Sequence, residues 1–171
     1  EDGATLSLER CDLSGGTSQR SIVEVSDDTT TAVISCCCIH DGKRDGVVIY
    51  GGASASLEFN NVHSNGGSGV LVEDEGSHVV LRNNRIHDME VCGVFIRDGA
   101  SATLENNTIS DNGLSGVEIT DQSTATLTVN TIKGNGQCKI EPTEEELERL
   151  GEASKLLKLA LTQGSPGVMV R

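Results

Sequence analysis

The sequence predicts an all-β fold: a parallel β-helix with three short strands per coil and one amphipathic helix inserted near the C-terminus. Two observations carry this prediction, a motif that recurs at nearly constant spacing and a composition with 20 glycines but only 2% aromatic residues. A narrow solenoid interior suits Val, Ile and Leu and leaves little room for Trp, which the chain lacks. Its 171 residues are enough for one domain with a hydrophobic core.

A Gly-Val motif marks the first strand of each predicted coil. Its four copies begin at Gly46, Gly69, Gly93 and Gly116. Successive copies are therefore 23, 24 and 23 residues apart. Two more apolar columns share this period, Leu8, Ile34, Leu57, Leu81, Leu104 and Leu127, followed five residues later by Leu13, Ile39, Val62, Ile86, Ile109 and Ile132. Three strands in about 23 residues describe one coil of a parallel β-helix. The rival fold, a β-propeller, is disfavoured because each of its blades needs about 40 residues.

A polar column lies between the second and third strands of each coil. It consists of Asn60, Asn84, Asn107 and Asn130, with Cys37 and Cys11 at the equivalent positions of the earlier coils. Stacked Asn side chains can bond their copies in the neighbouring coils, so we expect an Asn ladder at this turn.

The cysteines are expected to be mostly reduced, small core residues. One coil spacing between Cys11 and Cys37 would allow a disulfide by distance. Cys36 is expected to point inward, as is Phe59 at the equivalent position. The chain has no Cys-x-x-Cys pair, so no structural zinc site is indicated. This cysteine usage favours a reducing compartment, intracellular or organellar, but the sequence does not indicate which compartment.

The chain divides into three parts: β-helix coils at 1–142, an amphipathic α-helix at 143–163 and a return to a β-helix strand at 164–171. Thr143 and Glu146 form a capping box, and leucines mark one face of the helix. The coils begin and end partway through a turn of the solenoid. Since the chain starts at Glu1 without Met, we expect a processed or truncated product, or a partner that covers an end.

The charge excludes several partners. With 13 Lys and Arg against 26 Asp and Glu, the formal net charge is −13. Nucleic-acid binding needs clustered cations, so we expect no nucleic-acid partner, and an anionic membrane surface is disfavoured for the same reason. No segment approaches the roughly 18 apolar residues of a membrane helix, so no transmembrane segment is expected.

The motifs Ile39-His40-Asp41-Gly42, Arg85-Ile86-His87-Asp88 and the run from Gly93 to Ile109 resemble a known family. They are similar to the right-handed parallel β-helix repeats of the pectin-lyase-like superfamily, above all to those of F-box ubiquitin-ligase substrate receptors and their bacterial and algal relatives. The resemblance covers about 1–140 and implies a right-handed coil. It also implies carbohydrate binding or protein binding as functions, but no F-box is visible, so the ligase role does not carry over.

The outward face of the first-strand sheet is where β-helix enzymes of this superfamily carry catalytic carboxylates. Here its outward columns are Glu24, Val48, Leu71, Phe95 and Glu118, and Ser26, Tyr50, Glu73, Arg97 and Thr120. Neither paired carboxylates nor a calcium cluster beside a basic residue is recognisable, so no catalytic residue is assigned. The apolar stripe Val48, Tyr50, Leu71 and Phe95 indicates a covered surface. The predicted helix or another protein could cover it.

A histidine column is the candidate for metal binding. His40, His63 and His87 occupy equivalent outward positions, Asp41 and Asp88 follow two of them, and Cys38 precedes His40 by two residues. Imidazoles one coil apart could bind a transition metal. The column continues as Ser110 and Lys133, which favours a solvated surface column, so no metal and no other cofactor is predicted.

These observations favour a non-catalytic scaffold, a protein-interaction module that is a segment or subunit of a larger assembly. The alternative is a carbohydrate-binding or polysaccharide-degrading β-helix protein, a lyase, hydrolase or epimerase, whose catalytic coils lie outside this chain. The sequence therefore leans against an enzyme without deciding the question.

Overall fold

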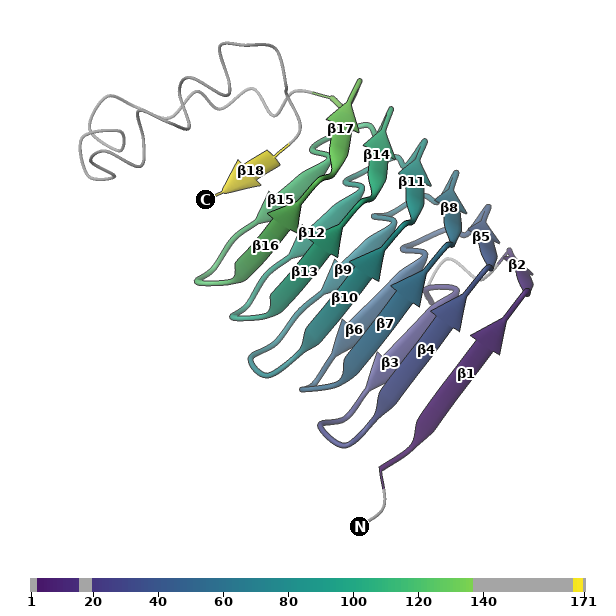
Figure 1. Ribbon diagram of the computed structural model, residues 1–171, viewed down its shortest axis with the longest axis vertical. Coiled ribbons are helices and arrows are strands. Elements are labelled where there is room, and N and C mark those ends of the chain that lie inside the picture. Colours follow the sequence, from purple (N-terminus) through teal and green to yellow (C-terminus); the bar gives the residue numbers. More distant parts are fainter. Residues whose placement is uncertain (1–2, 16–19, 137–167, 171) are drawn as a thin grey trace.

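The described residues of the computed structural model, 3–15, 20–136 and 168–170, form a β-solenoid of three parallel sheets (Figure 1). Sheet A consists of β1 (Thr5–Glu9), β4 (Thr31–Ser35), β7 (Ser54–Glu58), β10 (His78–Arg82), β13 (Ser101–Glu105) and β16 (Thr124–Thr128). Sheet B consists of β2 (Asp12–Ser14), β5 (Cys38–His40), β8 (Asn61–His63), β11 (Arg85–His87), β14 (Thr108–Ser110) and β17 (Thr131–Lys133). Sheet C consists of β3 (Val23–Ser26), β6 (Val47–Tyr50), β9 (Val70–Val72), β12 (Val94–Ile96), β15 (Val117–Ile119) and β18 (Val168–Val170).

Strands of equivalent position pair in parallel from one coil to the next, and the register places like residues beside like. In sheet A, for example, Leu81 pairs with Leu57 and with Leu104. Side chains alternate between interior and exterior along each strand, so these three leucines are completely buried. The predicted apolar columns are thus confirmed as the core. Leu8 and Leu127, in the end coils, are only partly buried.

The predicted Asn ladder is confirmed between sheets A and B. The backbone N and Nδ2 of Asn60 both donate to Asn84 Oδ1, at 2.9 and 3.1 Å. The pattern repeats from Asn84 to Asn107 and from Asn107 to Asn130. Each Nδ2 also donates to a buried main-chain carbonyl of the preceding coil, so the ladder satisfies polar groups inside the turn.

A second ladder, which the sequence analysis missed, lies between sheets B and C. Asn112 donates from N and Nδ2 to Asn135 Oδ1, at 3.1 and 2.7 Å, and accepts a bond from the backbone N of Met89. Asn65 accepts from the backbone N of Gly42, one coil earlier. Its signal was present, since Asn65, Asn112 and Asn135 share one register, but Gly42 and Met89 interrupt the column.

The prediction that Cys36 and Phe59 point inward is wrong. Both adopt the left-handed backbone conformation, with φ of 54° and 56°, at the corner between sheets A and B. This conformation reverses the alternation of side chains at a bend, so Cys36 is exposed and Phe59 is 60% exposed. Phe59 is therefore an outward aromatic residue that the sequence analysis did not identify.

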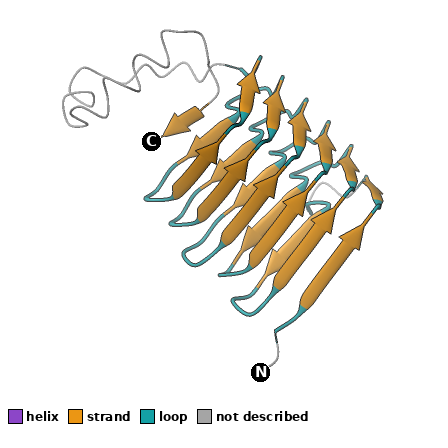
Figure 2. Cartoon of the chain, viewed as in Figure 1, coloured by secondary structure: helices purple, strands orange, loops and turns teal. Residues whose placement is uncertain are grey.

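No helix occurs among the described residues, which contain only strands and loops (Figure 2). The predicted helix at 143–163 lies outside the described residues and stays a prediction. After that segment β18 pairs with β15 at the end of sheet C. The described residues therefore include no helical segment that could span a bilayer.

Candidate functional site

Three histidines stack on the outer face of sheet B. His40 ends β5, His63 ends β8 and His87 ends β11, and the register places them in one column. The ring centroids of His40 and His63 lie 5.0 Å apart with planes 5° from parallel, and those of His63 and His87 lie 5.1 Å apart at 16°. The spacing of the coils, about 4.8 Å, thus sets the spacing of the imidazoles.

Each of these imidazoles is oriented by both of its nitrogens. Nδ1 bonds the side chain of the following residue: Asp41 for His40, Ser64 for His63 and Asp88 for His87. Nε2 bonds the side chain that begins the sheet B strand of the preceding coil. These partners are Asp12 Oδ1 at 2.8 Å, Cys38 Sγ at 3.4 Å and Asn61 Oδ1 at 3.0 Å, respectively.

The different neighbours give the stacked imidazoles different acidities. Hydrogen bonds to Asp41 and Asp12 raise the pKa of His40, because both carboxylates favour the imidazolium. Burial lowers the pKa of His63, and the imidazoles of His87 and His40 on either side lower it further. His63, at the centre of the column, therefore resists protonation, whereas the neighbours of His40, in the coil nearer the N-terminus, favour its protonation.

The N-terminal end of this column gathers potential metal ligands. One ligand atom each from Asp12, Cys38 and His40 lies within 4.8 Å of the other two. The sequence indicated His40, His63 and His87 as candidate ligands, but the structure adds Asp12, which lies 28 positions from His40 in the chain. Among the six cysteines, Cys11, Cys36, Cys37 and Cys38 form no disulfide. The Cys11 backbone N instead donates to Cys37 Sγ at 3.4 Å.

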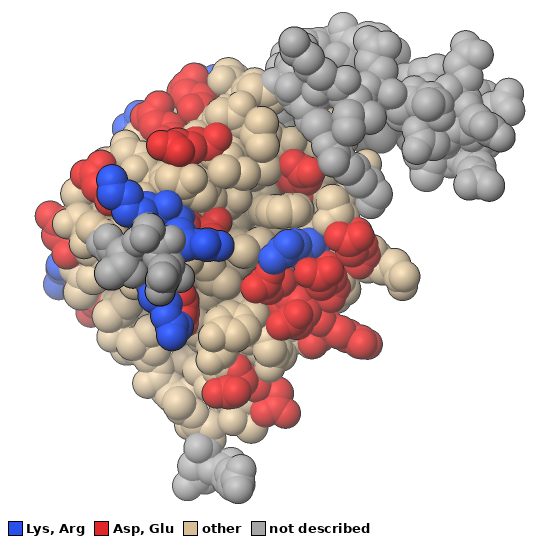
Figure 3. Space-filling model, turned by 180° about the vertical axis from the view of Figure 1, so that it is seen from behind, with Lys and Arg blue, Asp and Glu red and all other residues tan. Residues whose placement is uncertain are grey.

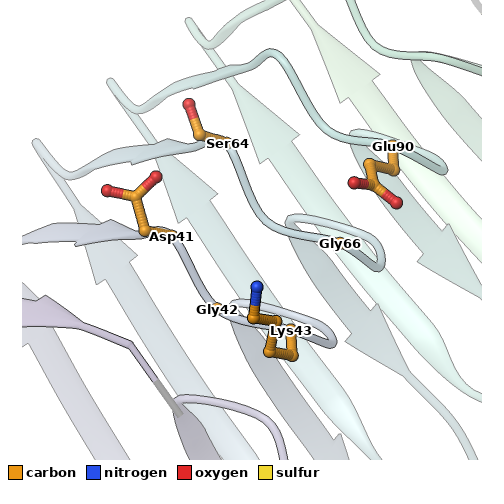
Figure 4. Close-up of a pocket in the computed structure, with 6 residues that line it drawn as sticks. All are labelled: Asp41, Gly42, Lys43, Ser64, Gly66 and Glu90. Carbon is orange, nitrogen blue, oxygen red and sulfur yellow. The ribbon is translucent and has the colours of Figure 1, made fainter. Parts of the chain in front are cut away.

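A polar hollow of about 270 Å³ adjoins the histidine column at the turns between sheets B and C (Figure 4). Three successive turns line it with Asp41, Gly42, Lys43, Ser64, Gly66 and Glu90. In Figure 4 the Asp41 carboxylate and the Ser64 hydroxyl point to the same side, and these groups hold His40 and His63. The hollow offers hydrogen-bonding groups but no aromatic ring.

The apolar stripe lies on the outer face of sheet C, although its members differ in exposure. Leu71 pairs with Val48 on one side and with Phe95 on the other, so the three side chains adjoin. Val48 is only 7% exposed, whereas Leu71, Phe95 and Tyr50 are half-buried. The accessible part of the stripe therefore consists of Leu71, Phe95 and Tyr50.

Arg97 and Glu73 flank this stripe. Arg97 donates from Nε and Nη2 to Glu73 Oε2 on the neighbouring coil, and Glu73 raises the pKa of Arg97. The Arg97 guanidinium also lies 5.7 Å from the centroid of the Phe95 ring, within cation–π range. Glu73 and Arg97 are consecutive members of a predicted outward column, and the structure confirms that they adjoin on neighbouring coils.

An acidic edge borders the same face, at the turns that join sheet C to sheet A. It consists of Asp27, Asp28, Asp74, Glu75, Asp98 and Asp121. Figure 3, seen from the side of sheet C, shows acidic side chains gathered along one edge of an uncharged area and basic side chains toward the other. Asp74 is fixed in part by the equivalent turn of the preceding coil, since its Oδ2 accepts a bond from the backbone N of Gly51.

The carboxylates on the outer face of sheet C are engaged with donors. Glu24 forms an ion pair with Arg20 at 2.7 Å, and this contact lowers the pKa of Glu24. Glu73 forms an ion pair with Arg97. Glu118 accepts a hydrogen bond from the Cys92 thiol at 3.2 Å. Glycoside hydrolysis needs one protonated and one ionised carboxyl group facing a common bond. Of these three carboxylates, Glu24 has a lowered pKa because it accepts a hydrogen bond from the Arg20 guanidinium, which favours its ionised form.

A family model described as a right-handed β-helix region matches residues 2–146. This match covers the coils that carry both the histidine column and the stripe on sheet C. No curated protein and no solved structure matches the chain significantly.

Proposed function

Because the chain belongs to the right-handed β-helix family, we propose that it is a non-catalytic binding module whose sheet C face docks a protein partner. A fold of this kind does not specify function, so the proposal depends on the surface. The observation that carries it is the adjoining pair Leu71 and Phe95, two large apolar side chains that face outward on neighbouring coils.

The rigidity of the sheet supports this proposal. Leu71 and Phe95 lie on strands paired on both sides, β9 and β12, so their backbone is already ordered before a partner binds. A preformed surface avoids the entropy cost of ordering loops on association. Aromatic residues at the centre of an interface commonly carry much of the binding energy, and Phe95 is the aromatic residue with an apolar neighbour here.

The charge supports a basic partner. The acidic edge adjoins the stripe, and the chain as a whole carries a formal charge of −13. Complementary charge accelerates encounter and disfavours acidic competitors. We therefore expect a protein whose apolar contact carries Lys and Arg on the side that meets the acidic edge, bound more weakly at high ionic strength because salt screens exposed charges.

The test compares proteins captured from an extract of the source organism by the immobilised wild-type chain and by Phe95→Glu and Leu71→Glu variants. Phe59→Ser is the matched control, since it removes an exposed aromatic ring from the corner between sheets A and B. A true partner is retained by wild type and Phe59→Ser and lost with both sheet C variants. For the purified partner, Phe95→Ala should weaken binding about 30-fold, as expected for a loss of about 2 kcal/mol.

Identical capture by wild type and by the two sheet C variants would contradict the proposal. Capture lost with Phe59→Ser but retained by Phe95→Glu and Leu71→Glu would place the contact at the corner and not on sheet C. The fold of each variant is checked by its far-ultraviolet circular dichroism.

The second candidate function is carbohydrate binding, which the polar hollow of Figure 4 favours. Its carboxylates Asp41 and Glu90 and the Lys43 ammonium could bond sugar hydroxyls. A binding and turnover screen against uronic-acid polymers, with and without calcium, tests this function. Absence of both binding and turnover would remove it, while binding lost in Lys43→Ala and Glu90→Ala would support it.

A further inference from the structure

Asp12, Cys38 and His40 bring three different metal-binding groups to one point on the outer face of sheet B. Asp12 and Cys38 begin the paired strands β2 and β5, and His40 ends β5. Cys38 and His40 are separated by one residue and therefore point to the same side of the strand. Their ligand atoms, with a carboxylate oxygen of Asp12, all lie within 4.8 Å of one another.

We propose that these three residues bind one zinc ion through Asp12 Oδ1, Cys38 Sγ and His40 Nε2, with water in the fourth tetrahedral position. Zinc accepts thiolate, imidazole and carboxylate ligands together, whereas calcium and magnesium require oxygen. On binding, the Cys38 S–H bond breaks, an S–Zn bond forms and the proton passes to solvent. The site is on sheet B, so it is independent of the proposed docking face on sheet C.

The distances need little adjustment. Ligand atoms of tetrahedral zinc lie about 3.3–3.7 Å from each other, given metal–ligand bonds of about 2.0–2.3 Å. Asp12 Oδ1 and His40 Nε2 are now 2.8 Å apart in a hydrogen bond, so an ion inserted between them moves them apart by about half an ångström. Asp12 can make this movement because its side chain is 78% exposed.

The neighbours already hold two of the three ligands. His40 Nδ1 bonds Asp41 Oδ2 at 2.7 Å, which directs Nε2 toward Asp12 in the carboxylate–histidine arrangement common at zinc sites. His63 Nε2 lies 3.4 Å from Cys38 Sγ, and Asn61 Nδ2 lies 3.9 Å from the same sulfur. His63 is therefore a positioning residue, because a ring N–H at this distance stabilises the thiolate without binding the metal.

The next coils repeat the geometry without the ligands, which provides an internal control. His87 occupies the same column and stacks on His63. Its Nε2 bonds the amide of Asn61, at the position that Asp12 holds for His40, and its own strand, β11, begins with Arg85 and not with a cysteine. Neither an amide nor a guanidinium replaces a thiolate and a carboxylate as a zinc ligand. Stacked histidines alone therefore do not make the site, and the first coil differs by Asp12 and Cys38.

The full chain is first reduced and freed of metal with a chelator. It is then titrated with Co²⁺ as a spectroscopic probe, and the bound Co²⁺ is displaced with Zn²⁺ to measure the zinc affinity. We expect one Co²⁺ per chain with a thiolate-to-cobalt charge-transfer band. Cys38→Ser should remove the band, and Cys36→Ser, an exposed neighbouring thiol, should keep it. Asp12→Asn and His40→Gln should weaken Zn²⁺ binding by at least the roughly 10–100-fold that loss of an outer partner produces. His87→Gln should leave the affinity unchanged.

Three results would overturn the proposal: no charge-transfer band in the wild-type chain, equal losses in Cys36→Ser and Cys38→Ser, or a His87→Gln affinity reduced as much as that of His40→Gln. His63→Gln should keep the one-to-one stoichiometry but shift the energy of the band, which a purely structural role would not do. Circular dichroism of the metal-free variants verifies that each retains the β fold, and Asp12→Asn, at an exposed side chain, provides a substitution that the fold tolerates.

Discussion

Asn107 accepts two hydrogen bonds from Asn84 through a single atom: Oδ1 lies 2.9 Å from the backbone N of Asn84 and 3.1 Å from its Nδ2. The same Nδ2 also donates to the carbonyl oxygen of Leu57 at 2.8 Å. Asn84 thus joins three consecutive coils through one buried side chain. A solenoid is stabilised mainly by contacts between neighbouring coils, so its stability should depend strongly on this residue.

Asn84→Ala should lower the free energy of unfolding by about 3 kcal/mol, because it removes the bond to the Leu57 carbonyl and takes the side-chain acceptor away from the buried backbone N of Asn60. Asn130→Ala, at the half-buried last member of the ladder, should cost about 1 kcal/mol, since water can replace its bonds. Urea denaturation measures both. Equal losses of stability in the two variants would show that the contribution of an Asn to the free energy of unfolding does not depend on its burial.

Cys37→Asn should stabilise the protein. Cys37 is buried in the Asn column, and its backbone N already donates to Asn60 Oδ1 at 2.9 Å. An Asn side chain there could add a bond to the same oxygen and one to the carbonyl of Leu8, as Asn60 does to Ile34. We expect a gain of about 1 kcal/mol in urea denaturation. A loss of stability would mean that the interior beside Cys37 does not accept the amide.

Gly93→Ala should be strongly destabilising for steric reasons. A Cβ on Gly93 would lie 2.5 Å from Ile109 Cγ2 and 2.6 Å from the carbonyl oxygen of Gly116. We expect a loss of about 3 kcal/mol in thermal or urea unfolding. Gly99→Ala separates this effect from backbone strain, because Gly99 has a φ of +80° but no atom nearer than 3.5 Å, and it should cost about 1 kcal/mol. The reverse order would contradict the steric argument.

His63→Gln should make the metal-free protein less sensitive to acid. The pKa of His63 is lowered in the folded state from 6.5, so protonation favours unfolding. This destabilisation is absent above the pKa that His63 has in the unfolded chain. It grows as the pH falls through 6.5 toward the lower pKa of His63 in the folded protein. The measurement is urea denaturation in chelator between about pH 7.5 and about pH 5.

The matched control for this pH series is His78→Gln on sheet A, where the ring contacts the hydroxyl of Ser101 and not another imidazole. Wild type should lose more stability on acidification than His63→Gln. Identical pH dependence of these two chains would show that the stacked imidazoles do not resist protonation.

The columns of the solenoid were predictable, and the bends between them were not. Residues such as Leu81 and Ile86 recur with one period, and parallel pairing in register converts that period directly into contacts. At a corner the backbone can enter the left-handed region at any of several positions, so the alternation that placed Phe59 inward failed there. Asn65 went unnoticed because its ladder contains a methionine and a glycine, which no polar pattern reveals.

The candidate sites show the same division. Periodicity and the two faces of a strand were enough to predict the three sheets, the composition of the core and which residues share an outward column. The folded chain was needed to show that Val48 is largely covered, that Phe95 adjoins Arg97 and that His40 meets Asp12 and Cys38. Side-chain rotamers govern those contacts, and rotamers do not follow from the spacing of residues along the chain.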